Sequence, residues 1–90
     1  MREWADFNVT EEGGRTTVVV TGPLLVATIG HLDAELREIE GPVQSVDISQ
    51  AYPIDTVGAW VIHRFAEAHS AEINGTSEQA DILLEAVEES

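Results

Sequence analysis

The chain has 90 residues, with 17 acidic side chains against four arginines and no lysine, which gives a net charge of −13. That charge repels phosphate backbones and anionic membrane surfaces, so it argues against nucleic-acid binding and makes a basic protein surface the natural complement. Cysteine is absent, which excludes disulfides and thiolate metal sites, and no apolar run approaches the ~20 residues of a membrane span.

A chain of this length forms one small domain, which we take as residues 1–90. The first six residues lack the basic and apolar regions of a signal peptide, so we expect a soluble cytoplasmic domain. The acidic charge has a simple explanation as well, because it keeps a small domain in solution whether or not a basic partner exists.

The N-terminal part predicts a β-hairpin. Residues 7–10 alternate apolar and polar side chains, and residues 16–21 are rich in valine and threonine, which favour strands. Gly13-Gly14 between them suits a tight turn. Gly22-Pro23 is expected to end the second strand, since proline cannot donate a hydrogen bond to a sheet.

From residue 25 the apolar period becomes that of an amphipathic helix. The apolar residues at this spacing are Ile29, Leu32, Leu36 and Ile39. Asp33 can pair with Arg37 one turn later. Gly41-Pro42 is expected to end the helix.

The second half alternates strands and helices. Residues 43–49 predict a strand that ends at a break over Ala51-Tyr52-Pro53, where we expect a projecting loop. Residues 57–69 predict a strongly apolar helix, residues 71–74 a short strand, and Thr76-Ser77-Glu78-Gln79 a capping box before a last helix. The predicted order is β-β-α-β-α-β-α. This is a single small α/β domain with a mixed sheet, because a hairpin is antiparallel and strands joined by helices are parallel.

Asp55-Thr56, at the start of the apolar helix, is the best candidate for a functional group. Asp55 can cap the helix, which leaves the Thr56 hydroxyl in the first turn, where backbone donors are unpaired and the helix dipole is positive. A phosphate on Thr56 would be stabilised there. On these local grounds alone, an ordinary helix start explains the pair more often than a site does.

Other residues of this region are weaker candidates. Tyr52 precedes the helix, and an exposed aromatic ring beside Thr56 would suit an interaction surface. Arg64 lies two turns after Thr56. Trp60 lies beside two apolar stripes, and such a residue belongs to a core more often than to a contact surface. One of those stripes is Val57, Val61, Phe65 and Ala68.

Catalytic and metal sites have little support. Asp47 is predicted near the end of its strand and close to Asp55, as in Mg²⁺-binding receiver domains, but those domains need a lysine and this chain has none. The three histidines share no i, i+4 spacing, and neither a Ser/His/Asp constellation nor a phosphate-binding glycine loop is present. We therefore expect no metal, no cofactor and no enzymatic activity.

The chain as a whole resembles a STAS domain, the module named for sulfate transporters and anti-sigma factor antagonists. The resemblance lies in Val20-Thr21-Gly22-Pro23-Leu24 before the first helix, then Val46-Asp47-Ile48-Ser49. Asp55-Thr56-Val57-Gly58 follows, with six residues between Ser49 and Thr56, and Ile73-Asn74-Gly75 precedes the last helix.

Two branches of the family are similar. Anti-sigma factor antagonists usually carry serine, phosphorylated by a partner kinase, where this chain has Thr56. The Asp-Thr-x-Gly-Ala-Trp pattern of residues 55–60 is more similar to Mla-type phospholipid ABC transporters, in which the STAS domain is a separate subunit or is fused ahead of the permease's membrane spans. The fused form resembles it most, so the chain would be the N-terminal piece of a longer permease.

The resemblance implies a non-enzymatic domain that binds and regulates the ATPase subunit beside the permease, at the cytoplasmic face of the inner membrane. The contact residues would be Tyr52, Asp55, Thr56, Trp60 and Arg64. The alternative is an anti-sigma factor antagonist-like switch phosphorylated at Thr56. Nucleotide binding, known in some STAS domains, ranks lower because the chain offers few cationic anchors. A weak homodimer is left open.

Overall fold

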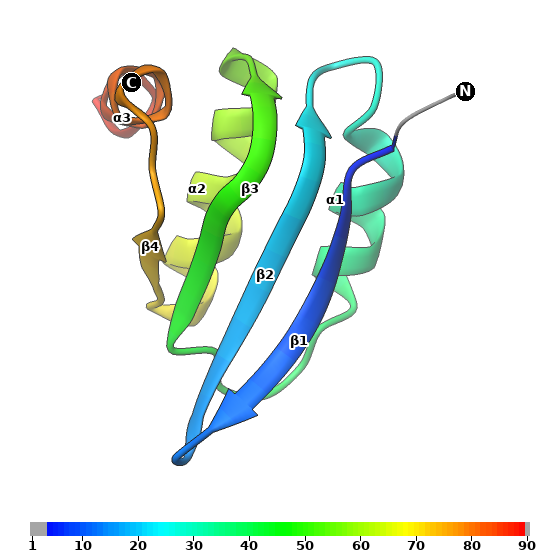
Figure 1. The fold of residues 1–90 in the computed structure, drawn as a ribbon, viewed down its shortest axis with the longest axis vertical. Helices are drawn as coiled ribbons and strands as arrows, with labels where there is room; N and C mark the ends of the chain where they lie inside the picture. Colours follow the sequence, from blue (N-terminus) through cyan, green and yellow to red (C-terminus); the bar gives the residue numbers. More distant parts are fainter. Residues whose placement is uncertain (1–3, 90) are drawn as a thin grey trace.

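The computed structural model describes residues 4–89, which form a mixed sheet with helices in the predicted order (Figure 1). The elements are β1 (Asp6–Glu12), β2 (Arg15–Leu24), α1 (Gly30–Arg37), β3 (Ser45–Ile54), α2 (Thr56–His69), β4 (Glu72–Asn74) and α3 (Glu78–Glu88). The α/β class predicted from the sequence is confirmed. Within residues 4–89 no helix has the length and apolar character needed to cross a membrane.

The strands lie side by side in the order β1-β2-β3-β4 (Figure 1). β1 is antiparallel to β2, with Phe7 opposite Val20. β2 and β3 are parallel, with Val18 opposite Val46, and β3 and β4 are parallel, with Val46 opposite Ile73. One antiparallel and two parallel pairs make the sheet mixed, as expected from an initial hairpin followed by helical connections.

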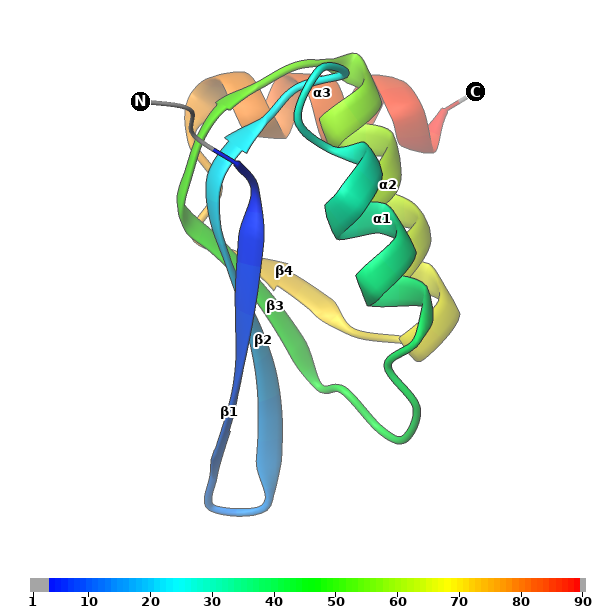
Figure 2. The same ribbon diagram turned by 90° about the vertical axis from the view of Figure 1, so that its right-hand side faces the viewer.

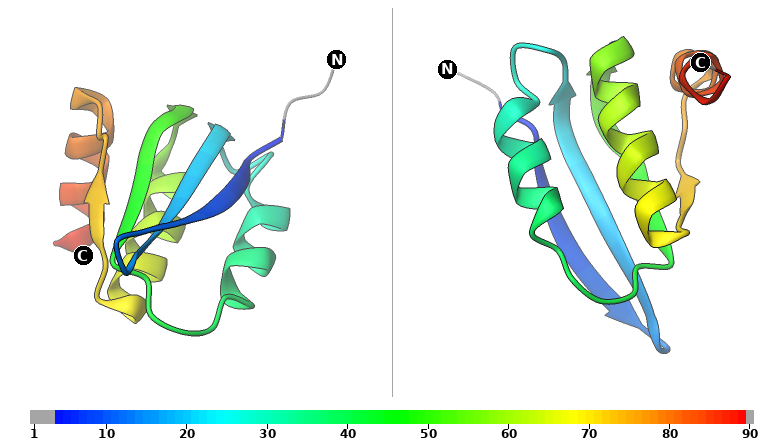
Figure 3. Two further views of the ribbon diagram at one scale, coloured as in Figure 1. Left: turned by 60° about the horizontal axis from the view of Figure 1, so that its bottom comes forward. Right: turned by 180° about the vertical axis from the view of Figure 1, so that it is seen from behind.

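α1 and α2 cover one face of the sheet, as Figure 2 and the right-hand view of Figure 3 show. Alternate residues of each strand point to that face, so Val18, Val20, Val46 and Ile48 are buried beneath the helices. The core is completed from the helices by Leu32, Leu36, Ile62, Phe65 and Ala66. The predicted inward positions at Leu32 and Leu36 of α1 are therefore confirmed.

The opposite face of the sheet is polar. Thr17 and Ser45 lie opposite each other on β2 and β3, and their hydroxyl oxygens are 2.7 Å apart, which gives the buried Ser45 a hydrogen-bond partner. Val19 and Asp47 form the next pair on the same face. Polar side chains make this face of the sheet suited to contact with water, whereas the apolar side chains of the opposite face pack against the helices.

α3 packs against α2, beyond the β4 edge of the sheet (Figure 1). Ser77 caps it, its hydroxyl accepting from the Ala80 amide at 3.1 Å. The predicted capping box is wrong, because the third helical residue after this cap is Ala80, which has no side chain to return the hydrogen bond.

The predicted ends of two elements before β3 are also wrong. β2 continues through Gly22-Pro23 to Leu24, and its register against β3 shifts between Gly22 and Leu24, so the ladder passes Pro23 without needing its missing amide donor. α1 begins only at Gly30, because Leu25 to Thr28 form a turn closed by the Thr28 amide to the Leu25 carbonyl oxygen at 2.8 Å. α1 ends at Arg37, before Gly41-Pro42.

β3 is longer than predicted. Gln50, Ala51 and Ile54 continue its parallel pairing with β2, so residues 51–53 are part of the strand and not a break or a loop. Asp47 consequently lies near the start of β3, not near its carboxyl end, and the rest of the strand separates it from Asp55. The arrangement that suggested a receiver-like pair of acids is absent.

Candidate functional site

The start of α2 is held by both carboxylate oxygens of Asp55. Oδ1 accepts from the Gly58 amide at 2.9 Å, which confirms the predicted cap. Oδ2 accepts from the Val26 amide at 2.9 Å, in the turn that follows β2. The Asp55 side chain therefore links the start of α2 to the turn between β2 and α1. The second bond was not predicted, since nothing in the local sequence signals a partner 29 residues away.

Gly58 brings α2 close to the end of β2. The Asp55 amide donates to the Leu24 carbonyl oxygen at 3.1 Å, and a Cβ at position 58 would overlap that oxygen and lie 2.8 Å from the Leu24 carbonyl carbon. Only glycine fits such an approach. The sequence reasoning used Gly58 as part of a motif, and this contact supplies the physical reason for it.

Thr56 is the first residue of α2, and its side chain is exposed. Within residues 4–89 its hydroxyl makes no hydrogen bond, and the cap is supplied by Asp55. The hydroxyl is therefore available to a partner at the positive end of the helix dipole. This is the placement expected for Thr56 from the sequence.

Large apolar side chains are exposed around Thr56. Trp60 is 45% exposed and Val57 is 39% exposed, so neither belongs to the core. Tyr52, near the end of β3, is 73% exposed, and Val26, beside Asp55, is 67% exposed. The predicted stripe of α2 is correct for Val61 and Phe65, which are buried, and wrong for the exposed Val57 and Ala68.

A hollow of about 320 Å³ is formed by Thr56, Val57 and Trp60 of α2 together with Val87 of α3. We call these four residues the α2–α3 hollow. Val87 was predicted only as an inward residue of α3, and its part in this surface was missed. An amphipathic pattern shows which side of a helix is apolar, but not which neighbouring residues that side will meet.

The Trp60 ring is supported from one side. It stacks on the His63 imidazole, with ring centroids 6.1 Å apart and planes inclined by 26°. His63 Nε2 lies 3.1 Å from the Glu67 carboxylate one turn later. The contacts of Trp60 with His63 and of His63 with Glu67 hold the indole on one side of α2. An aromatic side chain that is already partly ordered loses little conformational entropy when a partner covers it.

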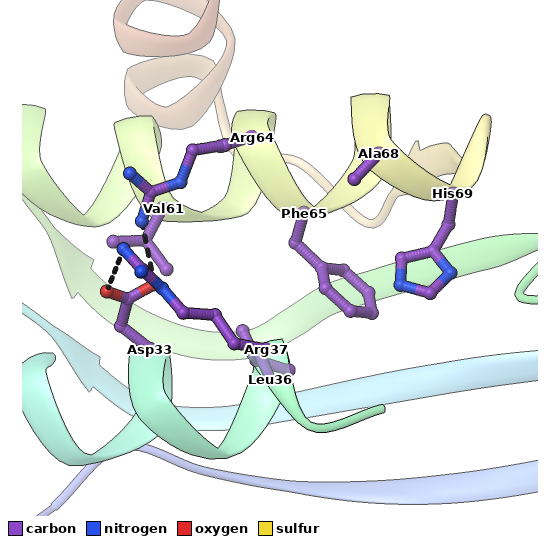
Figure 4. Close-up of a pocket in the computed structure, with 8 residues that line it drawn as sticks. All are labelled: Asp33, Leu36, Arg37, Val61, Arg64, Phe65, Ala68 and His69. Carbon is purple, nitrogen blue, oxygen red and sulfur yellow. Dashed lines mark hydrogen bonds and ion pairs between the residues drawn. The ribbon is translucent and has the colours of Figure 1, made fainter. Parts of the chain in front are cut away.

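Arg64 does not join the α2–α3 hollow. Its guanidinium reaches across to α1, where it pairs with Asp33 at 2.9 Å, as Figure 4 shows. Arg37 pairs with the same carboxylate at 3.2 Å, which confirms the predicted Asp33–Arg37 pair. The structure therefore brings Thr56 and Trp60 together, with Asp55 as their support, and places Arg64 in a separate groove between α1 and α2.

Asp47 has a structural role. Its Oδ1 accepts from the Ser49 amide at 2.8 Å, and Gly75 lies so close that a Cβ there would come 2.7 Å from the same oxygen. In the part of the chain that the structure describes, no group of three or more potential ligands could hold a metal ion.

Comparison of the chain with protein-family models found no match, and a search of curated proteins also found none. The resemblance to STAS domains therefore stays a prediction from the motifs and the order of the elements.

Proposed function

We propose that this protein is a non-enzymatic, STAS-type protein-binding domain of an Mla-type phospholipid ABC transporter, and that the α2–α3 hollow binds the ATPase subunit. The observation that carries the proposal is the exposed apolar and aromatic surface around the unpaired Thr56 hydroxyl. Tyr52, near the end of β3, and Val26, whose amide donates to Asp55, are further exposed residues near the start of α2. Tryptophan and tyrosine are the residues that dominate binding energy in protein interfaces.

The site is preformed, which favours tight binding of a partner. Asp55 fixes the helix start through two hydrogen bonds, and Gly58 holds α2 against Leu24. A partner therefore meets an ordered surface and does not have to supply the free energy of ordering it. A surface of this kind regulates by binding one state of its partner more tightly and shifting the population towards that state.

The charge around the site indicates the kind of surface that would meet it. Four exposed acidic residues of α3 and its C-cap line a second depression, namely Asp81, Glu85, Glu88 and Glu89. We expect the ATPase subunit to present an apolar pocket for Trp60 with arginine or lysine at its rim. Such charges raise the association rate and select the partner more than they raise affinity.

The proposal is tested by measuring the affinity of the ATPase subunit for the parent protein, Trp60→Ala and Thr56→Ala. Removing a central tryptophan is expected to weaken binding by at least about tenfold, and removing the threonine hydroxyl by a smaller factor. Val9→Ala is the matched control, because Val9 is also an exposed apolar residue but lies on β1, away from α2. Trp60→Ala binding as tightly as the parent would refute the proposed contact.

A phosphorylation switch is the second candidate, favoured by the exposed Thr56 hydroxyl at the helix N-terminus. In this function a kinase would add phosphate to Thr56 and release an anti-sigma factor. Incubation with the cognate kinase and ATP, followed by peptide mass analysis, separates the two candidates. A phosphate located on Thr56 supports the switch, whereas an unmodified Thr56 with tight ATPase binding supports the transporter function.

A further inference from the structure

A groove of about 340 Å³ runs between α1 and α2 (Figure 4), and it shares no lining residue with the α2–α3 hollow. We call it the α1–α2 groove. Its apolar lining comes from Leu36, Val61, Phe65 and Ala68, and its polar lining from Asp33, Arg37, Arg64 and His69. The proposed contact with the ATPase subunit at the α2–α3 hollow does not use it. Its volume is at the lower end of the range for small-molecule sites.

The charged residues gather at one end of the groove. Asp33 lies between two guanidiniums, 3.2 Å from Arg37 and 2.9 Å from Arg64 (Figure 4). Two positive groups against one negative group leave an excess of one positive charge at this end. Each guanidinium has five N–H donors in a planar fork, so the pairing with Asp33 leaves donors for a second carboxylate.

The rest of the groove is lined mainly by apolar side chains, and His69 lies at its far end (Figure 4). Phe65 and Ala68 follow Arg64 along α2, and His69 comes next (Figure 4). The His69 ring packs on Phe65 with centroids 4.5 Å apart, and its Nδ1 lies 3.2 Å from the Gly41 carbonyl oxygen. A cationic end followed by an apolar channel matches a molecule with one anionic end and a hydrocarbon chain.

We propose that the α1–α2 groove binds a medium-chain alkyl carboxylate. The carboxylate bridges Arg37 and Arg64, and the chain lies along Phe65 and Ala68 towards His69. A monoanion neutralises the single excess positive charge, whereas a phosphate dianion would exceed it in a protein whose net charge is already −13. The same net charge disfavours a second copy of this chain as the occupant, because the two copies repel each other.

The test is a calorimetric titration of the protein with hexanoate, octanoate and decanoate below their micellar concentrations, with decanol as the uncharged comparator. Affinity is expected to rise about two- to fourfold for each added methylene while the chain still fits the groove. Backbone amide NMR signals of residues 33–37 and 61–69 should shift with decanoate. Decanol binding as tightly as decanoate, or shifts confined to other segments, would overturn the proposal.

Three variants locate the ligand. Arg37→Met and Arg64→Met should each weaken decanoate binding by about tenfold or more, because each removes one of the two charge-assisted contacts to the carboxylate. Ala68→Trp should abolish binding by filling the groove from its exposed rim without a change of charge.

Arg15→Met is the matched control. It removes the same charge from an exposed arginine beside the β1–β2 turn, whose guanidinium lies 3.6 Å from the Glu72 carboxylate of β4. This change should leave decanoate binding unchanged. If Arg15→Met weakens binding as much as Arg64→Met, the attraction is a general charge effect and the groove is not the site. The ATPase measurements with Trp60→Ala are independent of these outcomes, because Trp60 does not line the groove.

Discussion

Asp55 links two parts of the chain with a single side chain. Its cap on Gly58 is local, since the two residues are three apart, and a preference of aspartate for this position made it predictable. Its bond to the Val26 amide depends on β2 and β3 being neighbours in the sheet, and only the folded chain supplies that partner. The residue therefore stabilises both the helix and its attachment to the β2–α1 turn.

Asp55→Ala is expected to lower the free energy of unfolding by about 2 kcal/mol, because it removes a helix cap and a second hydrogen bond to a backbone amide. Ser77→Ala removes a cap with one amide partner and should cost about 1 kcal/mol. Urea unfolding of the three proteins provides the measurement. Equal losses for the two variants would mean that the bond to Val26 adds nothing to stability.

The connection between β3 and α2 is a single residue. β3 ends at Ile54 and α2 begins at Thr56, so Asp55 alone joins them. This arrangement requires α2 to start against the sheet, and the contact of Gly58 with Leu24 is the consequence. The position of α2 therefore depends on Gly58 having no Cβ atom, because a Cβ would overlap the Leu24 carbonyl group.

Gly58→Ala is expected to destabilise the protein by more than about 2 kcal/mol, because overpacking against a backbone carbonyl can be relieved only by moving the helix. Gly30→Ala is the control. Gly30 is also in a helix, but a Cβ there meets nothing within 4 Å, so alanine should be neutral or stabilising by up to about 1 kcal/mol. Thermal unfolding of both variants tests the difference, and similar melting temperatures would exclude a close approach at Gly58.

The type and order of the elements followed from apolar periodicity, whereas several of their ends did not. Gly22-Pro23 and Tyr52-Pro53 are local signals for breaking a strand, yet β2 and β3 pass through both. Pairing between the two strands outweighs the local preference, and the register shift between Gly22 and Leu24 accommodates Pro23. Sequence patterns indicate the local conformational preference of a segment, whereas the residue at which a strand ends depends on hydrogen bonding to the neighbouring strand.

The net charge of −13 acts on the molecule as a whole. Acidic side chains repel one another in the compact state more than in the unfolded chain, so the charge lowers stability. The arginine pairs with Asp33 and the exposed pair of Arg15 with Glu72 offset little of this, because exposed ion pairs contribute little.

Raising NaCl from low ionic strength to about 0.5 M is expected to raise the melting temperature, by about 4–8 °C for each kcal/mol of repulsion that is screened. Circular dichroism at pH 7 measures the effect, and KCl should give the same curve if screening is the cause. A melting temperature that falls with salt would show that the arginine–carboxylate pairs outweigh the repulsion.

The sequence by itself determined the α/β class, the order of the elements, the cap at Asp55 and the inward residues of α1, because each depends on residues close together in the chain. Only the tertiary structure decided that Trp60 is exposed beside Val87, and that Arg64 joins Arg37 on Asp33. The physical reason is that the exposure and partners of a helix side chain depend on which other elements lie against it. The packing of α1 and α3 against α2 settles this for both residues.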